Sequence, residues 1–342
     1  MRILQVVHGF PPKQRAGTEI YTYYLSKELA KRHEVHIFYP AFDNVKRISL
    51  NSFERESLII HEVKIPNNKV KRLWNLLFFE NTYMNKNVEE IFRRLLKEIN
   101  PDIIHFEHLI GLSATLINVA KKFNIPSVLT LHDYWFMCPN IQLLRYDYTI
   151  CEGSEPNKCS ACWIKKQSKT LSGALNRYYI PKALTEKPLQ FILRAFNSPE
   201  KFKERENHMK SLLLKVNKII VPSKFLREVF TGYGVPKDKV IYSENGYNLE
   251  VFKEFKKKDK GTDKIIFGFV GGIAKHKGVH VLIDAFMYVP EDKAELRIYG
   301  NYNSSSKYVK ELLEKIKNKK NIKFVGRFED SCVGIHEYWK ES

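Results

Sequence analysis

Residues 264–288, KIIFGFVGGIAKHKGVHVLIDAFMY, form the most informative stretch of this sequence. The apolar run from Ile265 to Val270 predicts a buried parallel strand. Gly271 and Gly272 follow it directly. Glycine lets a chain turn without a Cβ clash and lets the backbone approach a ligand closely. The stretch therefore predicts a strand that ends in a tight, ligand-accessible turn.

Two lysines and the start of a helix complete this pattern. Lys275 and Lys277 follow the glycines, and the next helix has one apolar face, formed by Val279, Leu282, Ile283 and Phe286. Backbone N–H groups at a helix start and nearby ammonium groups are typical of a site for a phosphate dianion. An ordinary strand-to-helix turn whose lysines face water fits these residue types about equally well.

The composition of the chain indicates a globular protein with an excess of positive charge. Its 342 residues are enough for two domains, and 44% are hydrophobic. The 57 basic and 38 acidic side chains give a net charge of +19. Such an excess attracts nucleotides, anionic membranes or nucleic acids and does not distinguish among them. A basic surface that is only solvated accounts for the net charge equally well.

The sequence contains no segment typical of a membrane span or of a secretion signal. No run approaches the ~18 consecutive apolar residues that a spanning helix needs. The N-terminal run Met1–Val7 soon meets Pro11 and lacks the apolar core and cleavage site of a signal peptide. We therefore expect a cytoplasmic protein, either free or in peripheral contact with the inner face of a membrane.

Predicted strands and helices alternate along the chain. The expected strands are 3–7, 34–39, 58–63, 103–106, 127–131, 218–221, 240–242, 265–270, 295–299 and 321–325. The expected helices include 18–32 with Thr18 as N-cap, 87–99, 112–123, 224–233 and 307–317. Alternation of this kind predicts an α/β protein with parallel sheets, which bind ligands beyond the carboxyl ends of their strands.

Changes in composition divide the chain into two predicted domains. The first covers residues 1–245 and includes a cysteine-rich loop at 138–162 and a basic helical insert at 160–216. A lysine-dense linker at 246–264 leads to a shorter second domain at 265–342.

Five separated segments carry a resemblance to a known family. They are FPPKQRAGTEIYTYYL at 10–25, LTLHDYW at 129–135, IIVPSKFL at 219–226, NGYNLEVF at 245–252 and FVGGIAKHKG at 269–278. In this order they resemble the glycosyltransferase family 4 group. The resemblance implies a GT-B fold, in which two Rossmann-like domains face each other and the second holds a nucleotide-sugar donor. It also implies sugar transfer with retention of anomeric configuration.

The resemblance implies a donor-phosphate site formed by Gly17, Gly271, Gly272, Lys275 and Lys277. Sugar transfer requires stabilisation of the departing diphosphate as its charge develops, in a site that excludes bulk water. Lys277 is the main candidate for this role and Lys275 a weaker one. Where the family usually has an arginine after the strand glycine, this chain has Gly272.

His132 is the predicted catalytic residue. It follows a predicted strand, and the resemblance implies contact with the donor sugar near the reacting carbon rather than action as a nucleophile. A core histidine bonded to a carbonyl, with Asp133 as a loop cap, is the alternative. Glu107 and His108 follow another predicted strand, and for them we expect a solvated loop pair.

Four cysteines have spacing that suggests a metal site. Cys138, Cys151, Cys159 and Cys162 follow the pattern C-x12-C-x7-C-x2-C. In a cytoplasmic protein such a cluster favours a structural zinc site over disulfides, although four reduced thiols are the alternative. No catalytic metal is expected.

The helical insert combines aromatic and aliphatic residues with many lysines and arginines. Its large apolar residues are Trp163, Leu171, Tyr178, Tyr179, Leu189, Phe191, Ile192 and Phe196. We expect these side chains to pack on the first domain. Docking of a basic amphipathic surface on an anionic bilayer is the alternative, and it would suit a lipid-linked acceptor.

The end of the sequence suggests an incomplete second domain. About 70 residues follow Gly272, whereas a Rossmann-like domain usually has about six strands. The family's acidic motif has two glutamates separated by seven residues. Glu329 and Glu337 have this spacing but not the context, and Glu341 would begin a motif that the chain does not finish. We therefore expect a truncated chain, whose missing part a second polypeptide would supply.

These observations lead to one main functional hypothesis and one alternative. The main hypothesis is a retaining hexosyltransferase that moves sugar from a UDP- or GDP-sugar to a glycan or lipid-linked acceptor, with activity in doubt for the chain alone. The alternative is a non-catalytic module or remnant that binds an acceptor or a partner protein. We expect no nucleic-acid partner, since no such motif is found, and no dehydrogenase, since no G-x-G-x-x-G follows the first strand.

Overall fold

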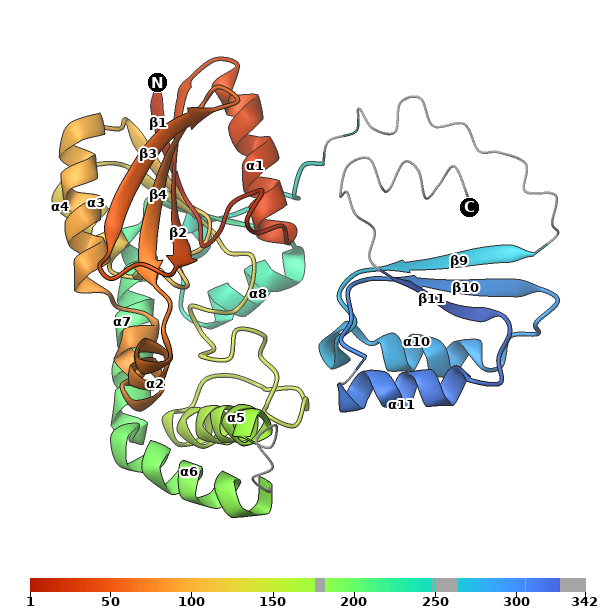
Figure 1. Ribbon diagram of the computed structural model, residues 1–342. Helices are drawn as coiled ribbons and strands as arrows, with labels where there is room; N and C mark the ends of the chain where they lie inside the picture. Colours follow the sequence, from red (N-terminus) through yellow and green to blue (C-terminus); the bar gives the residue numbers. More distant parts are fainter. Residues whose placement is uncertain (176–181, 248, 250–263, 305, 327–342) are drawn as a thin grey trace. The chain divides into compact units, whose positions relative to one another are not determined.

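A computed structural model describes residues 1–175, 182–247, 249, 264–304 and 306–326. The chain forms two compact units, Met1–Tyr247 and Asn248–Ser342 (Figure 1). Most of the predicted linker, the three glutamates considered for the acidic motif, and Tyr178 and Tyr179 of the insert lie outside the described residues.

An eight-stranded sheet in the order β3-β4-β2-β1-β5-β6-β7-β8 forms the centre of the first unit. Its strands are β1 (Arg2–Val6), β2 (Glu34–Asp43), β3 (Ser49–Arg55), β4 (Leu58–Pro66), β5 (Ile103–Phe106), β6 (Ser127–Thr130), β7 (Lys218–Val221) and β8 (Val240–Tyr242). All neighbouring strands pair in parallel except β3, which pairs antiparallel with β4 at the edge. The predicted parallel strands of this unit are therefore confirmed.

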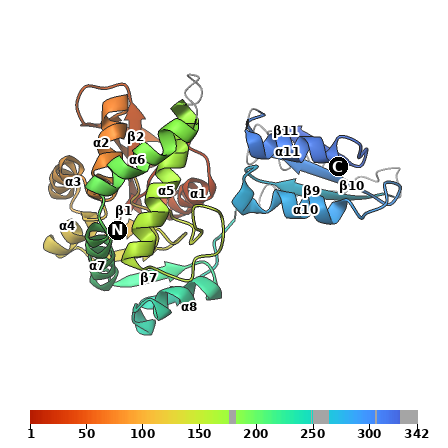
Figure 2. The same cartoon turned by 90° about the horizontal axis from the view of Figure 1, so that it is seen from below.

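Helices cover both faces of this sheet (Figures 1 and 2). They are α1 (Gly17–Ala30), α2 (Lys69–Leu77), α3 (Lys86–Ile99), α4 (Leu116–Lys122), α5 (Pro156–Leu175), α6 (Lys182–Phe196), α7 (Pro199–Lys215) and α8 (Lys224–Gly232). α3, α4 and α7 lie on one face, and α1 and α8 lie on the other. The strands between them are apolar because both sides of the sheet are buried, which is typical of parallel sheets.

Two details of the sequence prediction are wrong. Thr18 is not the N-cap of α1: the helix begins at Gly17, and the N-cap residue is Ala16, which offers no capping side chain. Thr18 lies in the first turn, where its carbonyl accepts a hydrogen bond of 2.8 Å from the Thr22 hydroxyl. The edge strand β3 was not predicted, because most of its residues are polar and exposed and give no apolar pattern.

The second unit contains a three-stranded parallel sheet in the order β11-β10-β9. Its elements are β9 (Ile265–Val270), α10 (Val279–Phe286), β10 (Ala294–Tyr299), α11 (Lys307–Ile316) and β11 (Ile322–Gly326). Both helices lie on one face of the sheet (Figure 1). The predicted apolar face of α10 is confirmed, since Val279, Ile283 and Phe286 are buried and Leu282 packs against them.

The prediction that β9 is buried is wrong. β9 is parallel as expected, but it is an edge strand, and Ile265 is 63% and Phe267 is 48% exposed. Within the described residues β9 pairs only with β10, so its side chains lack the cover of a second neighbouring strand, although the Phe267 ring still contacts Phe286 of α10 at 5.7 Å. An apolar run therefore did not establish burial on both faces.

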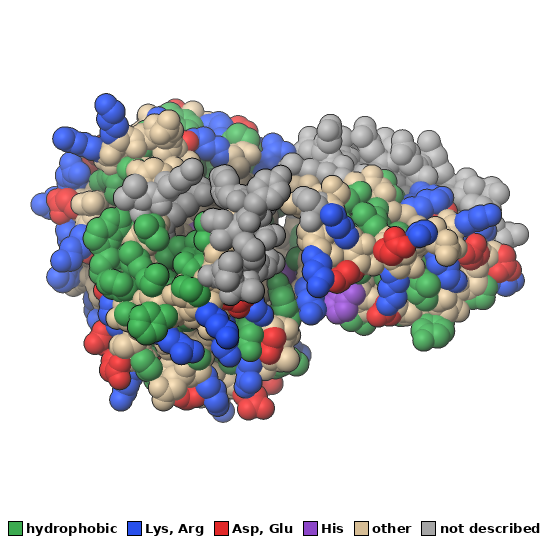
Figure 3. Space-filling view, turned by 60° about the horizontal axis from the view of Figure 1, so that its bottom comes forward, with side chains coloured by type: hydrophobic (Ala, Val, Ile, Leu, Met, Phe, Trp, Pro, Cys, Tyr) green, Lys and Arg blue, Asp and Glu red, His purple; other side chains and the backbone are tan. Residues whose placement is uncertain are grey.

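The helical insert packs on the first unit through only part of its apolar surface. Trp163 is buried, as expected, and Leu171 and Leu189 are half-buried. The packing prediction is wrong for Phe191, Ile192 and Phe196, whose side chains are 78%, 46% and 41% exposed. Figure 3 shows hydrophobic side chains gathered on this side of the larger unit. None of the described helices is both long and apolar enough to cross a membrane.

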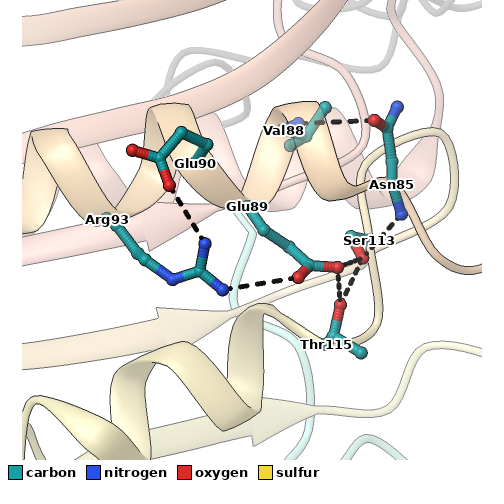
Figure 4. A network of polar contacts seen from close by, with 7 residues as sticks. All are labelled: Asn85, Val88, Glu89, Glu90, Arg93, Ser113 and Thr115. Carbon is teal, nitrogen blue, oxygen red and sulfur yellow. Dashed lines mark hydrogen bonds and ion pairs between the residues drawn. The ribbon is translucent and has the colours of Figure 1, made fainter.

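α3 shows how local sequence fixes one of these helices (Figure 4). Asn85 is the N-cap, and its Oδ1 accepts a hydrogen bond of 3.3 Å from the backbone N–H of Val88. One turn into the helix, the Glu89 carboxylate accepts hydrogen bonds from the Ser113 and Thr115 hydroxyls. These bonds tie α3 to the loop that leads into α4 and so fix the position of the loop that follows β5.

Candidate active site

Polar residues follow three neighbouring strands in the middle of the first sheet. β1, β5 and β6 are adjacent and parallel, and His8, Glu107 and His132 come just after them. The carboxyl ends of parallel strands meet at one edge of a sheet, where ligands of such folds usually bind. The topology therefore gathers these side chains, although they are far apart in sequence.

His132 and Glu107 form a buried pair at this edge. The Nε2 atom of His132 lies 2.8 Å from Glu107 Oε2, and the Glu107 side chain is fully buried. Glu107 Oε1 lies 3.4 Å from Nδ1 of His105. A buried carboxylate needs compensating charge or hydrogen bonds; here His132 supplies a hydrogen bond to Oε2, while Oε1 has no hydrogen-bond partner among the described residues.

The expectation that Glu107 and His108 form a solvated loop pair is wrong. Their exposed fractions are 0% and 6%. His108 lies between His8, whose ring centroid is 4.6 Å away, and Trp135, at 5.4 Å. The polar pair after β5 is buried because elements distant in sequence cover it.

A second imidazole–carboxylate pair lies beside the first. Nε2 of His108 lies 3.0 Å from Asp133 Oδ2, while Nδ1 accepts a hydrogen bond of 3.1 Å from the backbone N–H of Ile110. Because Nδ1 is an acceptor, Nε2 carries the ring proton, and this N–H donates the hydrogen bond to Asp133. Burial lowers the pKa of His108 below its usual value. Asp133 also caps its own loop, since it accepts from the backbone N–H of Trp135 at 2.8 Å.

The first turns of α1 complete the cluster. Gly17 begins this helix, and no atom lies within 4 Å of the position where a Cβ would stand. Glu19 is buried and lies 3.3 Å from His8. Burial raises the pKa of its carboxyl, but His8 and backbone hydrogen bonds together lower it by more, so the pKa is below the usual value. The Tyr21 ring packs edge-on to His132 at 5.3 Å, and burial together with Glu107 raises its pKa to about 12.

Sequence reasoning missed the contributions of His8, Glu19 and Tyr21. Glu19 and Tyr21 lie within the first family-like segment, two and four residues after Gly17. Gly17 and Tyr21 are four residues apart and therefore share a helix face, whereas Glu19, two residues from each, does not lie on that face. That periodicity was the available signal, but only the position of α1 over the sheet edge shows which side chains use it.

The predicted glycine–lysine loop lies in the second unit, at the carboxyl end of β9. The Gly271 N–H donates a hydrogen bond of 3.0 Å to the Tyr299 carbonyl. A Cβ at Gly300 would lie 1.9 Å from the Gly271 carbonyl oxygen, so the two backbones meet where no side chain fits. Gly272 is exposed and begins the turn, its carbonyl accepting from the Ala274 N–H at 3.0 Å.

Lys275 and Lys277 lie on the short helical turn η4 (Lys275–Lys277), and both are exposed. Gly278 follows with φ of 71°, a left-handed conformation that favours glycine, and is the N-cap of α10. The structure thus brings the glycines and lysines of the prediction together on one loop. His132 and Gly17 lie on the first unit.

Two family models match separate parts of the chain. The model described as Glycosyltransferase Family 4 matches residues 15–159, and the model described as Glycosyl transferases group 1 matches residues 250–335. Their order along the chain agrees with the two units and with the segments that carry the sequence resemblance. This chain belongs to the family 4 glycosyltransferases.

Among curated proteins, the chain is similar to an uncharacterised 42.6 kDa protein in the cps region of Klebsiella pneumoniae. The two are 29% identical over 133 residues, which are 39% of this family 4 chain and 33% of the relative. The chain thus matches about a third of that relative's length.

Solved structures with the same fold include Anabaena Alr3699/HepE in complex with UDP and glucose. The two structures superimpose with a TM-score of 0.52 at 14% sequence identity, and the superposition covers 98% of this chain and 71% of that chain. A second structure is named trehalose-6-phosphate from E. coli and was solved with UDP-2-fluoro glucose. It superimposes with a TM-score of 0.55 at 10% sequence identity, over 99% of this chain and 76% of that chain. These likenesses confirm the GT-B fold class for the family 4 chain.

The four cysteines of this family 4 chain line one cavity of about 170 Å³. Cys159 and Cys162 come from α5, and Cys138 and Cys151 come from the preceding loop. All four are free thiols, and burial raises the pKa of Cys138, Cys159 and Cys162. Within the described part of the chain, no three His, Cys, Asp or Glu side chains are placed to hold a metal ion. The zinc site therefore stays a prediction, for which the shared cavity is the supporting observation.

Proposed function

We propose that this chain transfers a hexosyl group from a nucleotide-sugar donor to a glycan or lipid-linked acceptor, with retention of configuration. The observation that carries the proposal is the imidazole of His132, held by the buried Glu107 carboxylate 2.8 Å away at the carboxyl edge of a parallel sheet. This is where the fold places ligands, and the chain's family performs this class of reaction.

In this proposal His132 orients the donor sugar and does not attack it. Its Nε2–H is donated to Glu107, and among the described residues its Nδ1 has no hydrogen-bond partner. Nδ1 is then an acceptor for a sugar hydroxyl. A fixed imidazole contributes by positioning the sugar, which lowers the barrier without a covalent step.

The glycine–lysine loop would hold the donor diphosphate. Backbone N–H groups near Gly271 and Gly272 and the ammonium groups of Lys275 and Lys277 are the candidate donors of hydrogen bonds to phosphate. Gly17, at the start of α1, would offer further N–H groups. Positive charge at the leaving group stabilises the diphosphate as the glycosidic bond to it breaks.

The donor is a UDP- or GDP-sugar in this proposal. Two structures with the same fold were solved with UDP or a UDP-sugar analogue, which supports testing uridine nucleotides first. The side chains of the donor pocket determine which nucleotide base is recognised, and a comparison of donors identifies that base.

A thermal-shift panel of UDP-, GDP- and ADP-sugars on the purified chain tests donor binding, and a radiolabelled-sugar assay tests transfer and hydrolysis. We expect Lys277→Ala to weaken donor binding about 10- to 100-fold, since a hydrogen bond to a charged group contributes about 1.5–3 kcal/mol. Lys307→Ala, at an exposed lysine of α11, is the matched control. Equal donor affinity in wild type and Lys277→Ala would refute the role of this loop.

A non-catalytic binding module is the second candidate, because the described second unit has only a three-stranded sheet. This second candidate predicts that the chain alone binds the donor or the acceptor but does not turn over the donor. In that case a second polypeptide that completes the donor domain should restore turnover. Turnover by the purified chain would exclude this candidate.

A further inference from the structure

An apolar patch on α2 and α6 of the first unit is not explained by sugar transfer. It comprises Leu73 and Trp74 of α2 and Phe191, Ile192 and Phe196 of α6, which are 41–78% exposed. The two helices contact each other, and Figure 2 shows them next to one another. Large apolar side chains that are exposed together mark an interaction surface more often than chance exposure.

Ring contacts link the α2 and α6 parts of the patch. The Trp74 ring stacks on Phe78 with centroids 4.6 Å apart, and Phe78 contacts Phe196 edge-on at 5.8 Å. Beneath them the buried side chain of Asn197 bonds to the Phe79 N–H and to the Leu76 and Leu193 carbonyls. Trp74 and Phe196 are therefore carried on segments that hydrogen bonds tie together.

Charge on the same two helices is strongly positive. The only acidic residue in the α2 and α6 sequences is Glu186. Their basic residues are Lys69, Lys71, Arg72, Lys182, Lys187 and Arg194. Apolar side chains bordered by basic sequence fit a surface that is apolar inside and anionic outside.

We propose that this α2–α6 patch docks on an anionic lipid bilayer. Trp74, Phe191 and Ile192 would enter the headgroup and acyl boundary, where aromatic side chains are favoured. The exposed side chains of Lys187 and Arg194 would contact anionic headgroups, each adding to the attraction while salt screens it. The inference concerns membrane binding alone, so it holds or fails independently of sugar transfer.

Vesicle flotation of the full chain tests the proposal, with phosphatidylcholine vesicles compared with vesicles that also contain phosphatidylglycerol. We expect binding to the anionic vesicles, weakened by added salt, and little binding to the neutral ones. The double variant Trp74→Ser/Phe191→Ser should bind at least tenfold more weakly. The matched control Phe225→Ser/Tyr288→Ser, at residues 63% and 89% exposed elsewhere, should bind as wild type does.

Circular dichroism and the thermal unfolding midpoint verify that the variants fold, and Phe191→Ser alone serves if the double variant does not. Wild type that does not bind anionic vesicles, or a folded patch variant that binds like wild type, would overturn the proposal. Light scattering that shows a dimeric wild type and a monomeric patch variant would also overturn the proposal, because a second copy of the chain would then cover the patch.

Discussion

Glu107 is a carboxylate with no exposed surface, and its environment defines its role. One oxygen accepts from His132, and the other lies 3.4 Å from His105, whose Nε2 is 2.7 Å from the Thr130 hydroxyl. Residues in such chains fix the orientation of the group that touches the ligand. Glu107 is thus a positioning residue for His132 in the proposed reaction.

Glu107→Gln is expected to lower the transfer rate about 10- to 100-fold, the usual cost of removing an outer partner of a functional group. The amide oxygen can still accept from His132 Nε2, so the ring stays in place but loses the neighbouring charge. Donor affinity, measured by thermal shift, should change little. Initial rates at saturating donor make this comparison.

Glu295→Gln is the matched control, since Glu295 lies on β10 of the second unit, where its carboxylate accepts hydrogen bonds from Arg297 at 2.6 Å and Lys323 at 2.9 Å. It should keep wild-type rates. An unchanged rate in Glu107→Gln would show that the buried pair serves stability rather than the reaction.

At the scale of elements, Asn197 joins segments that are far apart in sequence. It lies between α6 and α7, and its side chain accepts from the Phe79 N–H at 3.1 Å and donates to the Leu76 carbonyl at 3.1 Å. Leu73 and Trp74 of α2 are more than half exposed, so packing of these two side chains does little to hold the helix. These bonds therefore hold α2 and the turn η1 (Phe79–Thr82) against the insert.

Asn197→Ala should lower the free energy of unfolding by roughly 2–3 kcal/mol, because it leaves buried backbone groups unpaired. Urea denaturation followed by circular dichroism measures this change. Asn157→Ala, at an exposed asparagine of α5, should change stability by less than about 0.5 kcal/mol. Equal losses in the two variants would contradict the joining role of Asn197.

The cysteine loop provides a second prediction at this scale. If the four thiols that line one cavity close on an ion, protein purified without chelator should contain about one zinc per chain. Zinc binding would deprotonate thiols whose pKa burial now raises, so protons should be released on loading.

Elemental analysis and proton release on zinc titration test this prediction. Cys159→Ser/Cys162→Ser should lose the metal and melt at a lower temperature, whereas wild type treated with chelator should melt with the variant. Metal-free wild type with unchanged stability would favour four reduced thiols.

For the whole molecule, buried histidines determine how stability responds to acid. His36 and His61 stack in the core of the first sheet with ring nitrogens 2.8 Å apart, and burial together with His36 lowers the pKa of His61 to about 4. Burial also lowers the pKa of His105 and His108. The unfolded chain takes up protons on these imidazoles at a higher pH than the folded chain does.

Stability is therefore expected to fall as the pH drops from about 6.5 toward 4, by up to about 1.4 kcal/mol per pH unit for each such histidine. Above the unfolded pKa these residues are neutral in both states and contribute no pH dependence. Urea midpoints at pH 7.5 and 5.5 measure the effect. His61→Gln should reduce the difference, and His276→Gln, at an exposed position, should leave it unchanged. A difference that His61→Gln leaves intact would contradict the assignment.

The sequence predicted the parallel strands and the glycine–lysine loop because these depend on local properties. Apolar runs, glycine turns and helix periodicity act over a few residues, and β5, β7 and β8 begin and end where the pattern placed them. His132 was predicted from its place after a strand. The edge strand β3 and the exposed side of β9 were not, since polarity at an edge depends on which neighbours are present.

Only the tertiary structure decided which polar residues are buried and with which partners. Glu107 and His108 looked like a solvated loop, but the sheet order places β5 between β1 and β6, and α1 covers the same edge. Conversely, Phe191 looked like core and is exposed, because α6 buries its opposite face. Burial is a property of contacts between segments distant in the chain. A local pattern can therefore fix an element and its turn, while the surroundings of a charged or aromatic side chain follow from the packing.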